Sequence, residues 1–298
     1  MRNVEQPTAP SAARSSRSWG IAPGDPITED LEAVRLLGGG SAYEAWLAFD
    51  QVTWAPVVVK VLRPDQVDSP AARRALLREA RALADVNHPG VVRGLRHDVD
   101  AARPHLVLEQ VDGPRLSSLV RRHGPLTEQQ YLPLGIDLAS ALHYMGRIGY
   151  VHLDVKPSNV IMGAPARLID LSVARPVAQA ATLDQPVGTD AWMAPEQCDP
   201  VRLGAPTPAS DVWALGATLH YAVTGARAFP EANEGVRFPQ LHVAPAPMPE
   251  RVPAEVRRVV AACLERRPQD RPSPAEVSVA LEPVLARQPE ARLTYKVR

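Results

Sequence analysis

The patterning of this chain changes from strand-like to helix-like at one break, Asp112-Gly113-Pro114, and this change limits the folds open to it. Before the break, short runs of apolar and β-branched residues predict strands over residues 31–37, 43–49, 56–62, 91–97 and 105–111. A helix interrupts them, with Pro70 at its first position and Ser69 as its N-cap. After the break, apolar spacing and capping residues predict helices over residues 127–144, 210–223, 253–266 and 274–285. Strands gathered in one part and helices in another predict an α+β fold with a small β-rich lobe and a larger α-helical lobe.

The domain organisation follows from the same break. Residues 1–26 are rich in Ser, Arg, Ala and Pro and show no periodicity, so we expect a flexible N-terminal tail. The β-rich lobe is expected over residues 27–111 and the α-helical lobe over residues 112–287, with a C-terminal tail over residues 288–298. Because no sensor domain follows residue 285, we expect a regulatory signal to arrive through a partner or through a tail.

Charge and composition exclude several classes of function. The chain has 33 Lys and Arg against 33 Asp and Glu, so no net charge attracts it to nucleic acid or to an anionic membrane. Its longest apolar stretch, residues 213–223, is interrupted by polar residues and is too short to span a membrane. The first thirty residues contain no apolar region typical of a secretory signal, and two cysteines are too few for a disulfide framework. These features predict a cytoplasmic protein in a reducing compartment.

Lysine is scarce in this chain, and its positions are informative. Lys60, Lys156 and Lys296 are the only lysines among 33 basic residues, and arginine fills the other basic positions. A lysine kept in such a background is expected where a compact ammonium on a flexible stem is needed and a planar guanidinium does not serve. Chance is the alternative for any one of them, so the surroundings of Lys60 and Lys156 decide between the two explanations.

The β-rich part contains two features suited to a polyphosphate. Gly38-Gly39-Gly40 lies between two predicted strands, where glycines let backbone N–H groups approach phosphates, although a plain hairpin has the same composition. Lys60 ends a β-branched strand, and Glu79 is the one glutamate of the predicted helix that follows. Because a buried ammonium needs a counter-charge, a Lys60–Glu79 pair would hold the ammonium beside nucleotide phosphates. An exposed lysine and a solvated glutamate are the alternative.

The most specific pattern lies in the α-helical part. Asp154, Lys156 and Asn159 occur within one short loop, and Asp170 follows the apolar residues 168–169 in the next. Phosphoryl transfer uses a carboxylate to accept the hydroxyl proton and oxygen ligands to hold Mg²⁺. Two carboxylates, an amide and a lysine at this spacing therefore indicate a phosphoryl-transfer site.

In this order and spacing the motifs resemble those of the eukaryotic-like protein Ser/Thr kinase family, in its bacterial branch, over about residues 30–285. The resemblance implies a bilobal protein-kinase-like fold. It also implies transfer of the γ-phosphoryl group of ATP, with Mg²⁺ as cofactor, to Ser or Thr of protein substrates. On this resemblance Asp154 is the catalytic base and Lys156 contacts the phosphate, while Asn159 and Asp170 bind the metal.

The resemblance also implies a nucleotide site. Lys60 matches the strand lysine that contacts the phosphates, and Glu79 matches its helix partner. Leu108 matches the gatekeeper beside adenine. The nucleotide-binding residues implied in this way are Leu37, Gly38, Gly39, Gly40, Ala45, Val58, Lys60, Leu108, Glu109, Val111 and Ile161.

A substrate-facing region follows from the same resemblance. Residues 188–196 match the loop that ends in Ala-Pro-Glu and faces the protein substrate, with Thr189 near the catalytic base. Asp211 matches the aspartate of a buried helix that anchors the catalytic loop. Arg271 matches the arginine that pairs with Glu196.

Several residues depart from the family pattern. Tyr43 replaces the third glycine of the phosphate loop. At the two positions that lie on one face of adenine in the family, Ala45 stands in place of valine and Val58 in place of alanine. Since the exchange conserves volume, we expect a reshaped but intact adenine slot. Leu153 replaces the arginine that, in the family, pairs with a phosphorylated residue of the activation loop. In the activation loop of this chain, Thr182 is the ordinary candidate for phosphorylation. The sequence therefore predicts activity without phosphorylation of that loop.

The metal-binding motif departs from the family as well. Asp170 is followed by Leu171 and Ser172, where the family has phenylalanine and glycine. Neither change touches a group needed for metal binding or proton acceptance.

Two other functions share part of this pattern. A nucleotide-binding pseudokinase that acts as a signalling scaffold has the same fold but commonly lacks some of the charged and polar residues of the site. In this chain the set is complete: Lys60, Glu79, Asp154, Asn159 and Asp170. A kinase of small molecules, such as an aminoglycoside kinase, shares the Asp and Asn pairs. The Ala-Pro-Glu segment and Arg271 instead favour a platform for a peptide, so we expect a protein kinase.

Overall fold

The computed structural model describes residues 18–232 and 235–289 of the chain. These residues divide into two compact units. The first unit contains the residues up to 84 together with 93–110, and the second contains residues 85–92 together with those from 111 onward. The first is built around a sheet and the second around helices, so the predicted α+β fold with a β-rich and a helical part is confirmed.

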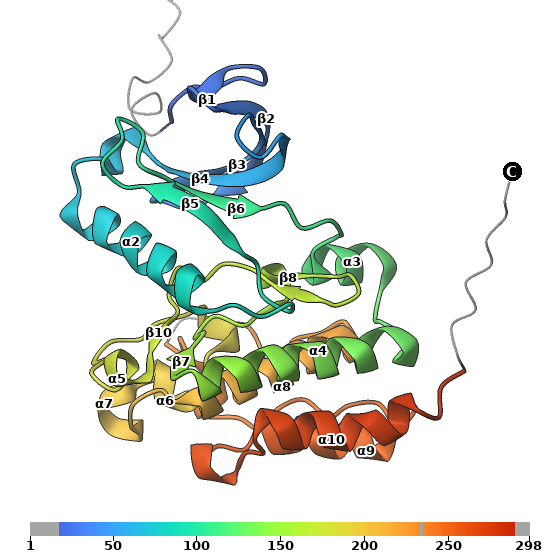
Figure 1. Cartoon of the computed structure of the whole chain (residues 1–298). Helices are drawn as coiled ribbons and strands as arrows, with labels where there is room; N and C mark the ends of the chain where they lie inside the picture. The colour runs from blue at the N-terminus through green and yellow to red at the C-terminus, as the bar shows by residue number, and fades with distance from the viewer. Residues whose placement is uncertain (1–17, 233–234, 290–298) are drawn as a thin grey trace, which may run out of the picture. The chain divides into compact units, whose positions relative to one another are not determined.

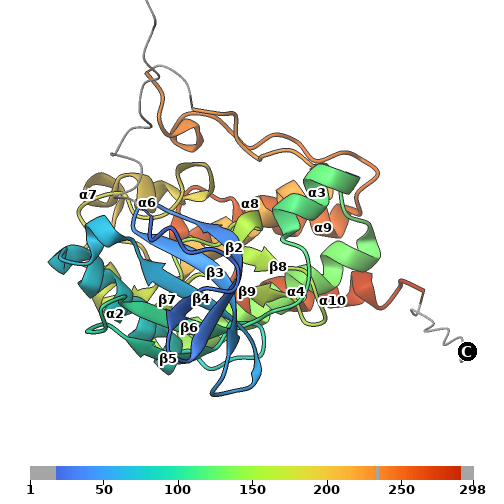
Figure 2. The same ribbon diagram turned by 90° about the horizontal axis from the view of Figure 1, so that it is seen from above.

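The first unit contains a six-stranded antiparallel sheet with the order β1-β2-β3-β4-β6-β5, which can be followed in Figure 1. Figure 2 shows β2 to β6 from above. Its strands are β1 (Pro26–Thr28), β2 (Leu31–Gly39), β3 (Tyr43–Asp50), β4 (Ala55–Leu62), β5 (Gly94–Asp98) and β6 (His105–Glu109). β2, β3, β4 and β6 lie within a few residues of the predicted strands. The strand expected over residues 91–97 starts three residues later, at Gly94, because residues 85–92 belong to the second unit.

Alternation along β3 and β4 gives this sheet two different faces. Trp46, Val57 and Val59 are buried on one face, where they form a core cluster with apolar residues of β1, β2 and β6. Because successive side chains of a strand point to opposite faces, Val58 and Lys60 lie on the other face. The sheet therefore separates its apolar core from the predicted nucleotide-binding positions.

The helix of the first unit begins where the sequence predicts. One turn, η1 (Pro64–Gln66), precedes α2 (Pro70–Asp85), whose start is capped by Ser69 Oγ accepting from Ala72 N at 3.3 Å. Glu79 is buried on this helix among apolar neighbours. Since burying a carboxylate costs free energy unless it is paired, Glu79 requires a partner.

Residues 18–26 correct the expectation of a flexible tail that extends to residue 26. Trp19 Nε1 donates to Leu62 O at 2.7 Å, and the Arg103 guanidinium lies 5.1 Å from the centre of the Trp19 ring. Trp19 and Ile21 pack against the core cluster of the sheet. The polar composition of the segment as a whole hides these two apolar residues, which dock on the first unit. Residues 1–17 of the expected tail lie outside the described residues.

The second unit consists mainly of helices (Figure 1). Its helices are α3 (Leu116–His123), α4 (Glu128–Arg147), α5 (Val177–Ala180), α6 (Pro195–Cys198), α7 (Pro200–Leu203), α8 (Pro208–Thr224), α9 (Ala254–Cys263) and α10 (Pro274–Leu285). Single turns are η2 (Pro157–Asn159), η3 (Asp190–Trp192), η4 (Pro239–Leu241) and η5 (Pro268–Asp270). α8 is buried along most of its length and contacts α4 and α9, while α10 contacts α4 and α9.

Capping residues explain which of these helices the sequence predicts. α8 is closed by Gly225 and α10 is capped by Ser273, as expected. α3 was not predicted, and the residue before it, Arg115, makes no side-chain cap hydrogen bond. α9 ends three residues before the predicted Arg266. The C-terminal tail expected from residue 288 begins with a docked residue, since Gln288 Nε2 donates to Glu128 Oε2 at 2.6 Å.

Two short antiparallel ladders hold the loops of the second unit. β7 (Tyr150–Val151) pairs with β10 (Arg175–Pro176), and β8 (Val160–Ile161) pairs with β9 (Arg167–Leu168). Residues 85–92 join this unit because Val92 N donates to Leu168 O at 2.9 Å. None of the helices in the described ranges has the length and apolar character needed to cross a membrane.

Candidate active site

Lys60 and Glu79 form a buried ion pair within the first unit. Lys60 Nζ lies 2.5 Å from Glu79 Oε1, and the two side chains are 8% and 4% exposed. β4 brings the lysine and α2 the glutamate to the same place, so each buried charge receives its counter-charge. The ring of Tyr43 lies beside the pair, with its centre 4.9 Å from Lys60 Nζ.

The predicted adenine-binding residues of the first unit share a face of the sheet with Lys60. In the strand register, Ala45 lies opposite Lys60 on β3 and β4, and Val58 lies opposite Leu108 on β4 and β6. Directly opposed residues of antiparallel strands point to the same face, as do residues two apart on one strand. Ala45, Val58, Lys60 and Leu108 therefore form one continuous surface, opposite the core cluster.

The glycine run covers the end of β2, with Gly38 and Gly39, and the first residue of its connection to β3, Gly40. Gly38 has a φ of 133°, and a Cβ on Gly39 would lie 2.3 Å from Tyr43 O, so a side chain is disfavoured at both positions. Gly40 N donates to Tyr43 O at 3.1 Å. Leu37 is half-buried in β2. Gly38 thus has a backbone conformation that favours glycine, and Gly39 has no room for a side chain.

Arg63 contacts the glycine run and is a residue that sequence reasoning missed. Its Nε donates to Gly40 O at 2.8 Å, and its Nη1 donates to the buried Glu44 Oε1 at 3.2 Å. The arginine just after β4 therefore ties the glycine run to β3. An arginine after a strand has no distinguishing pattern in the sequence, so no local signal could have found it.

The second unit gathers the predicted catalytic residues around the carboxylate of Asp154. Its Oδ1 accepts from Thr189 Oγ1 at 2.6 Å. Its Oδ2 accepts from Lys156 Nζ at 2.7 Å and from Asn159 Nδ2 at 3.0 Å. Lys156 Nζ also donates to Thr189 Oγ1 at 2.6 Å. Four predicted residues from two separate loops thus meet at one carboxylate, which is held in a fixed orientation.

Asp211 of α8 holds the backbone before this carboxylate. Its Oδ2 accepts from His152 N at 2.7 Å and its Oδ1 from Leu153 N at 2.8 Å. Burial raises the pKa of Asp211 to about 7, whereas the two backbone N–H bonds act to lower it. Leu153 has a φ of 65°, a left-handed conformation that is strained for leucine. The two bonds from Asp211 support that conformation and so position Asp154.

Asn159 and Asp170 are placed next to each other by the β8–β9 ladder. Val160 pairs with Leu168, and Ile169 N donates to Asn159 O at 2.9 Å. Asn159 is bound to Asp154 through its nitrogen, so its side-chain oxygen is the atom that a cation would take. An amide oxygen and a carboxylate form a donor set that suits Mg²⁺.

The remaining predicted nucleotide residues divide between the units. Glu109 belongs to the first unit, where its Oε1 accepts from Arg93 N at 2.9 Å. Val111 and Ile161 belong to the second, and Ile161 is 8% exposed on β8.

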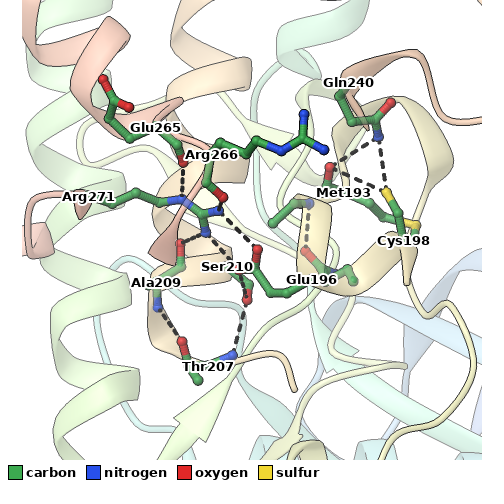
Figure 3. Close-up of polar contacts among 12 residues, drawn as sticks. Met193, Glu196, Cys198, Thr207, Ala209, Ser210, Gln240, Glu265, Arg266 and Arg271 are labelled. Carbon is green, nitrogen blue, oxygen red and sulfur yellow. Dashed lines mark hydrogen bonds and ion pairs between the residues drawn. The ribbon is translucent and has the colours of Figure 1, made fainter. Parts of the chain in front are cut away.

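Glu196 and Arg271 form a buried bidentate ion pair (Figure 3). The distances from Arg271 Nη1 and Nη2 to the two carboxylate oxygens of Glu196 are 2.7 and 2.9 Å. The Glu196 side chain is 1% exposed and the Arg271 side chain is 0% exposed. Ser210 Oγ donates to the same carboxylate at 2.6 Å. The pair fixes α6, and with it the end of the loop over residues 188–196.

An apolar cluster packs residues 170–196, the predicted activation segment, against the predicted catalytic loop that contains Asp154. The buried residues Val151, Leu153 and Ala180 form its centre, and four partly buried residues surround them: Val173, Val177, Leu183 and Val187. We call these seven residues the segment cluster. Gln197, which sequence reasoning missed, donates from Nε2 to Leu153 O and Val187 O at 2.9 Å each. The segment is thus joined to the catalytic loop by apolar contacts and by a buried amide.

Comparison with known proteins gives a consistent result. Residues 31–280 match the family model described as the protein kinase domain. The chain is 33% identical over 265 residues to the probable serine/threonine-protein kinase PkwA of Thermomonospora curvata, covering 88% of this chain. It is 31% identical over 259 residues to the serine/threonine-protein kinase PknB of Mycobacterium leprae, covering 82% of this chain. It is 38% identical over 231 residues to the serine/threonine-protein kinase PknK of Mycobacterium tuberculosis, covering 74% of this chain.

These relatives are longer than the matched region. The alignments cover 35% of PkwA, 41% of PknB and 20% of PknK. The chain therefore spans well under half the length of these curated relatives.

Proposed function

Since this chain belongs to the protein kinase domain family, we propose that it is an ATP- and Mg²⁺-dependent kinase that phosphorylates serine or threonine of protein substrates. The observation that carries the proposal is the arrangement around Asp154, where Lys156, Asn159 and Thr189 all lie within 3.0 Å of its carboxylate oxygens. A lysine two residues after the base, together with this threonine, is typical of the Ser/Thr type in the family that the sequence resembles.

The proposed mechanism relies on positioning and on charge. Asp154 accepts the proton of the substrate hydroxyl, and its fixed carboxylate aligns that hydroxyl for transfer. Lys156 stabilises negative charge on the phosphoryl group, because its ammonium is held 2.7 Å from Asp154 Oδ2. In the first unit, Lys60 supplies a second ammonium for the nucleotide phosphates, oriented by Glu79.

The metal belongs to the same proposal. Asn159 and Asp170 would hold Mg²⁺, which when bound neutralises charge on the phosphates. The side-chain nitrogen of Asn159 donates to Asp154 O and Oδ2, both at 3.0 Å, so the asparagine is oriented by the residue that serves as base.

We further propose that activity does not depend on phosphorylation of the activation segment. In kinases that use this control, an arginine beside the catalytic aspartate receives the new phosphate. Leu153 occupies that position here and is buried in the segment cluster. The apolar contacts of the cluster support an ordered segment in the absence of any phosphate. Thr182 is exposed, and its Oγ1 donates to Gln179 O at 2.9 Å.

The partners and the compartment complete the proposal. Protein substrates are the proposed partners, and the balanced charge of 33 basic and 33 acidic residues gives no attraction to nucleic acid. We place the reaction in the cytoplasm, which supplies ATP and keeps thiols such as Cys198 and Cys263 reduced.

Transfer of labelled phosphate from ATP tests the function directly. The purified chain is incubated with γ-labelled ATP and Mg²⁺, alone and with a generic basic protein as acceptor. We expect wild type to label the acceptor and Asp154→Asn to lose about 10²- to 10⁴-fold in rate, because a general base is removed. Asp184→Asn is the matched control, since Asp184 is an exposed aspartate outside the cluster of residues around Asp154. Nucleotide binding by wild type without any transfer would instead establish the scaffold alternative.

A further inference from the structure

A buried glutamine from a distant part of the chain holds residues 188–193, the first part of the predicted substrate-facing loop over residues 188–196. Gln240 lies in η4, between α8 and α9, and its Nε2 donates to Asp190 O at 2.6 Å and to Met193 O at 3.1 Å. The same nitrogen lies 3.3 Å from Cys198 Sγ, and Figure 3 shows the amide directed at Met193 and Cys198. Because Asp190 begins η3 and Met193 follows it, one amide bridges the two ends of this turn.

The burial of Gln240 makes these bonds important for the shape of the loop. The residue is 3% exposed, and Met193 and Cys198 are 2% and 4% exposed. Water cannot easily replace a lost donor in such a place, and hydrogen bonds are stronger at low local dielectric. Among the described residues, Gln240 Oε1 is buried without a hydrogen-bond partner. The amide nitrogen of Gln240 thus forms hydrogen bonds with two carbonyls of the loop, whereas its amide oxygen forms none with the described residues.

A second contact reaches the same loop from the same segment. Arg237 donates from Nε to Asp190 Oδ2 at 2.7 Å and from Nη2 to Asp190 Oδ1 at 3.1 Å. The two side chains are 63% and 40% exposed, so solvent weakens this pair. The buried hydrogen bonds of Gln240 therefore hold the loop more strongly than the exposed ion pair of Arg237, which orients the side chain of Asp190 at the surface.

Cys198 contributes to this contact as a neutral thiol. Burial raises its pKa to about 12, so the sulfur stays protonated near neutral pH. Its Sγ lies 3.9 Å from Met193 O, as a weak donor to a carbonyl that Gln240 also contacts. The role of the cluster is thus to hold the loop, and Cys198 is not poised as a nucleophile.

The loop held by Gln240 also carries Thr189, which contacts the catalytic base. Trp192 N donates to Thr189 O at 2.8 Å, which joins the η3 turn to that threonine. Asp154 has two further donors outside the loop, Lys156 and Asn159. A shift of the η3 turn therefore alters the surface offered to a substrate more than it alters the base itself.

We propose that Gln240 is a positioning residue for the protein substrate, an inference that rests on the proposed kinase function. It acts through the carbonyls of Asp190 and Met193, and it sets the shape of the loop on which the segment around the acceptor hydroxyl is bound. Its loss should weaken binding of the protein substrate while leaving ATP binding and the chemical step nearly unchanged.

The first experiment compares Gln240→Met with wild type in steady-state phosphorylation of a generic basic protein. Methionine keeps the length of the side chain and removes both N–H donors. We expect KM for the protein substrate to rise roughly tenfold, the order expected for the loss of two ordinary hydrogen bonds. KM for ATP and kcat should stay within about twofold of wild type. Equal KM for the protein substrate, or a matching rise in KM for ATP, would overturn the proposal.

Gln288→Met is the matched control variant. Gln288 also donates from Nε2, to Glu128 Oε2 at 2.6 Å, but it joins the end of α10 to α4. We expect this variant to keep both KM values. A rise in KM for the protein substrate as large as that of Gln240→Met would show that any lost glutamine contact has this effect, and would refute the specific role.

A second measurement does not need activity. Hydrogen–deuterium exchange of the backbone amides over residues 188–198 should be faster in Gln240→Met than in wild type and in Gln288→Met. Unchanged exchange there would refute the role of Gln240. If wild type transfers no phosphate, the proposed function fails, whereas this measurement still decides whether Gln240 holds the loop. If Gln240→Met does not fold, Gln240→Asn takes its place, since the shorter amide cannot reach both carbonyls, and the same shifts are expected.

Discussion

Replacing Arg271 with methionine should cause a large loss of stability, and the size of the loss can be worked from its contacts. The guanidinium makes five hydrogen bonds, two to Glu196 and one each to the carbonyls of Ala209, Glu265 and Arg266. Figure 3 shows the group enclosed by these acceptors. The Arg271 side chain is 0% exposed and that of Glu196 is 1% exposed.

The main cost of Arg271→Met is the charge that it leaves behind. Glu196 would keep the hydroxyl of Ser210 at 2.6 Å but lose its counter-charge while still buried. Removing one partner of a buried ion pair costs about 3–5 kcal/mol of unfolding free energy. The contact between the guanidinium and the Trp213 ring, 5.1 Å from its centre, is lost as well. For a unit of this size, such a loss lowers Tm by roughly 10 °C.

Urea unfolding followed by tryptophan fluorescence measures the effect. The set consists of Arg271→Met, Glu196→Gln and the double variant, with Arg287→Met as control. Arg287 forms a surface pair with Glu255 at 3.0 Å, with side chains 58% and 38% exposed, so its loss should change stability by less than about 1 kcal/mol. The double variant should lose less than the sum of the single changes, since no buried charge is left unpaired.

Two results would refute this reasoning. One is a loss below about 1 kcal/mol in Arg271→Met, which is the range of an exposed pair. The other is strict additivity in the double variant, because two residues that share a buried bidentate contact should be coupled.

Three further predictions concern regulation, nucleotide binding and pH. After phosphatase treatment, Thr182→Ala should keep its turnover within about tenfold of wild type, or ~1.4 kcal/mol of barrier, and a larger loss would show that phosphorylation there matters. Tyr43→Leu should weaken binding of a fluorescent ATP analogue by about threefold, because the ring beside Lys60 Nζ is lost, whereas Tyr43→Phe should not. Burial, and then the nearby Arg167, lower the pKa of His88, whose Nδ1 accepts from Gly90 N at 3.0 Å. Since the unfolded chain then binds more protons, the unfolding free energy should fall as pH drops below about 6.5. His88→Asn keeps an acceptor and does not titrate, so a fall as steep in that variant would contradict the assignment.

Features of the structure that depend on local signals were predictable from the sequence. The β-branched run ending at Lys60 indicated β4, and Ser273 with Glu276 indicated the start of α10, where Ser273 N donates to Glu276 Oε2 at 2.7 Å. The Lys60–Glu79 contact was also predictable, because a charge at the end of a buried strand needs a partner and the next helix contains one glutamate.

Features that depend on contacts between distant segments were not predictable in this way. Trp19 donates to a carbonyl 43 residues away, and Gln240 to one 50 residues away. Trp19 lies in an irregular segment and Gln240 in the single turn η4, and no periodicity or capping pattern marks either residue. Arg63 is hidden for the same reason, since its effect depends on the course of the β2–β3 connection. Their roles follow from the folded chain, which alone brings the acceptor carbonyls to these donors.

The segment cluster around Leu153 also determines which outside influences can act on the activation segment. A phosphate held by an arginine is a charge contact, which salt screens and which other enzymes can install and remove. Leu153, Val177 and Leu183 have no charge to screen and no group to modify. Apolar contacts weaken on cooling instead, so temperature, rather than a partner enzyme, would shift the balance between a packed and a loosened segment. On the proposed function, the order of this segment would therefore respond to temperature and hardly at all to the salt concentration.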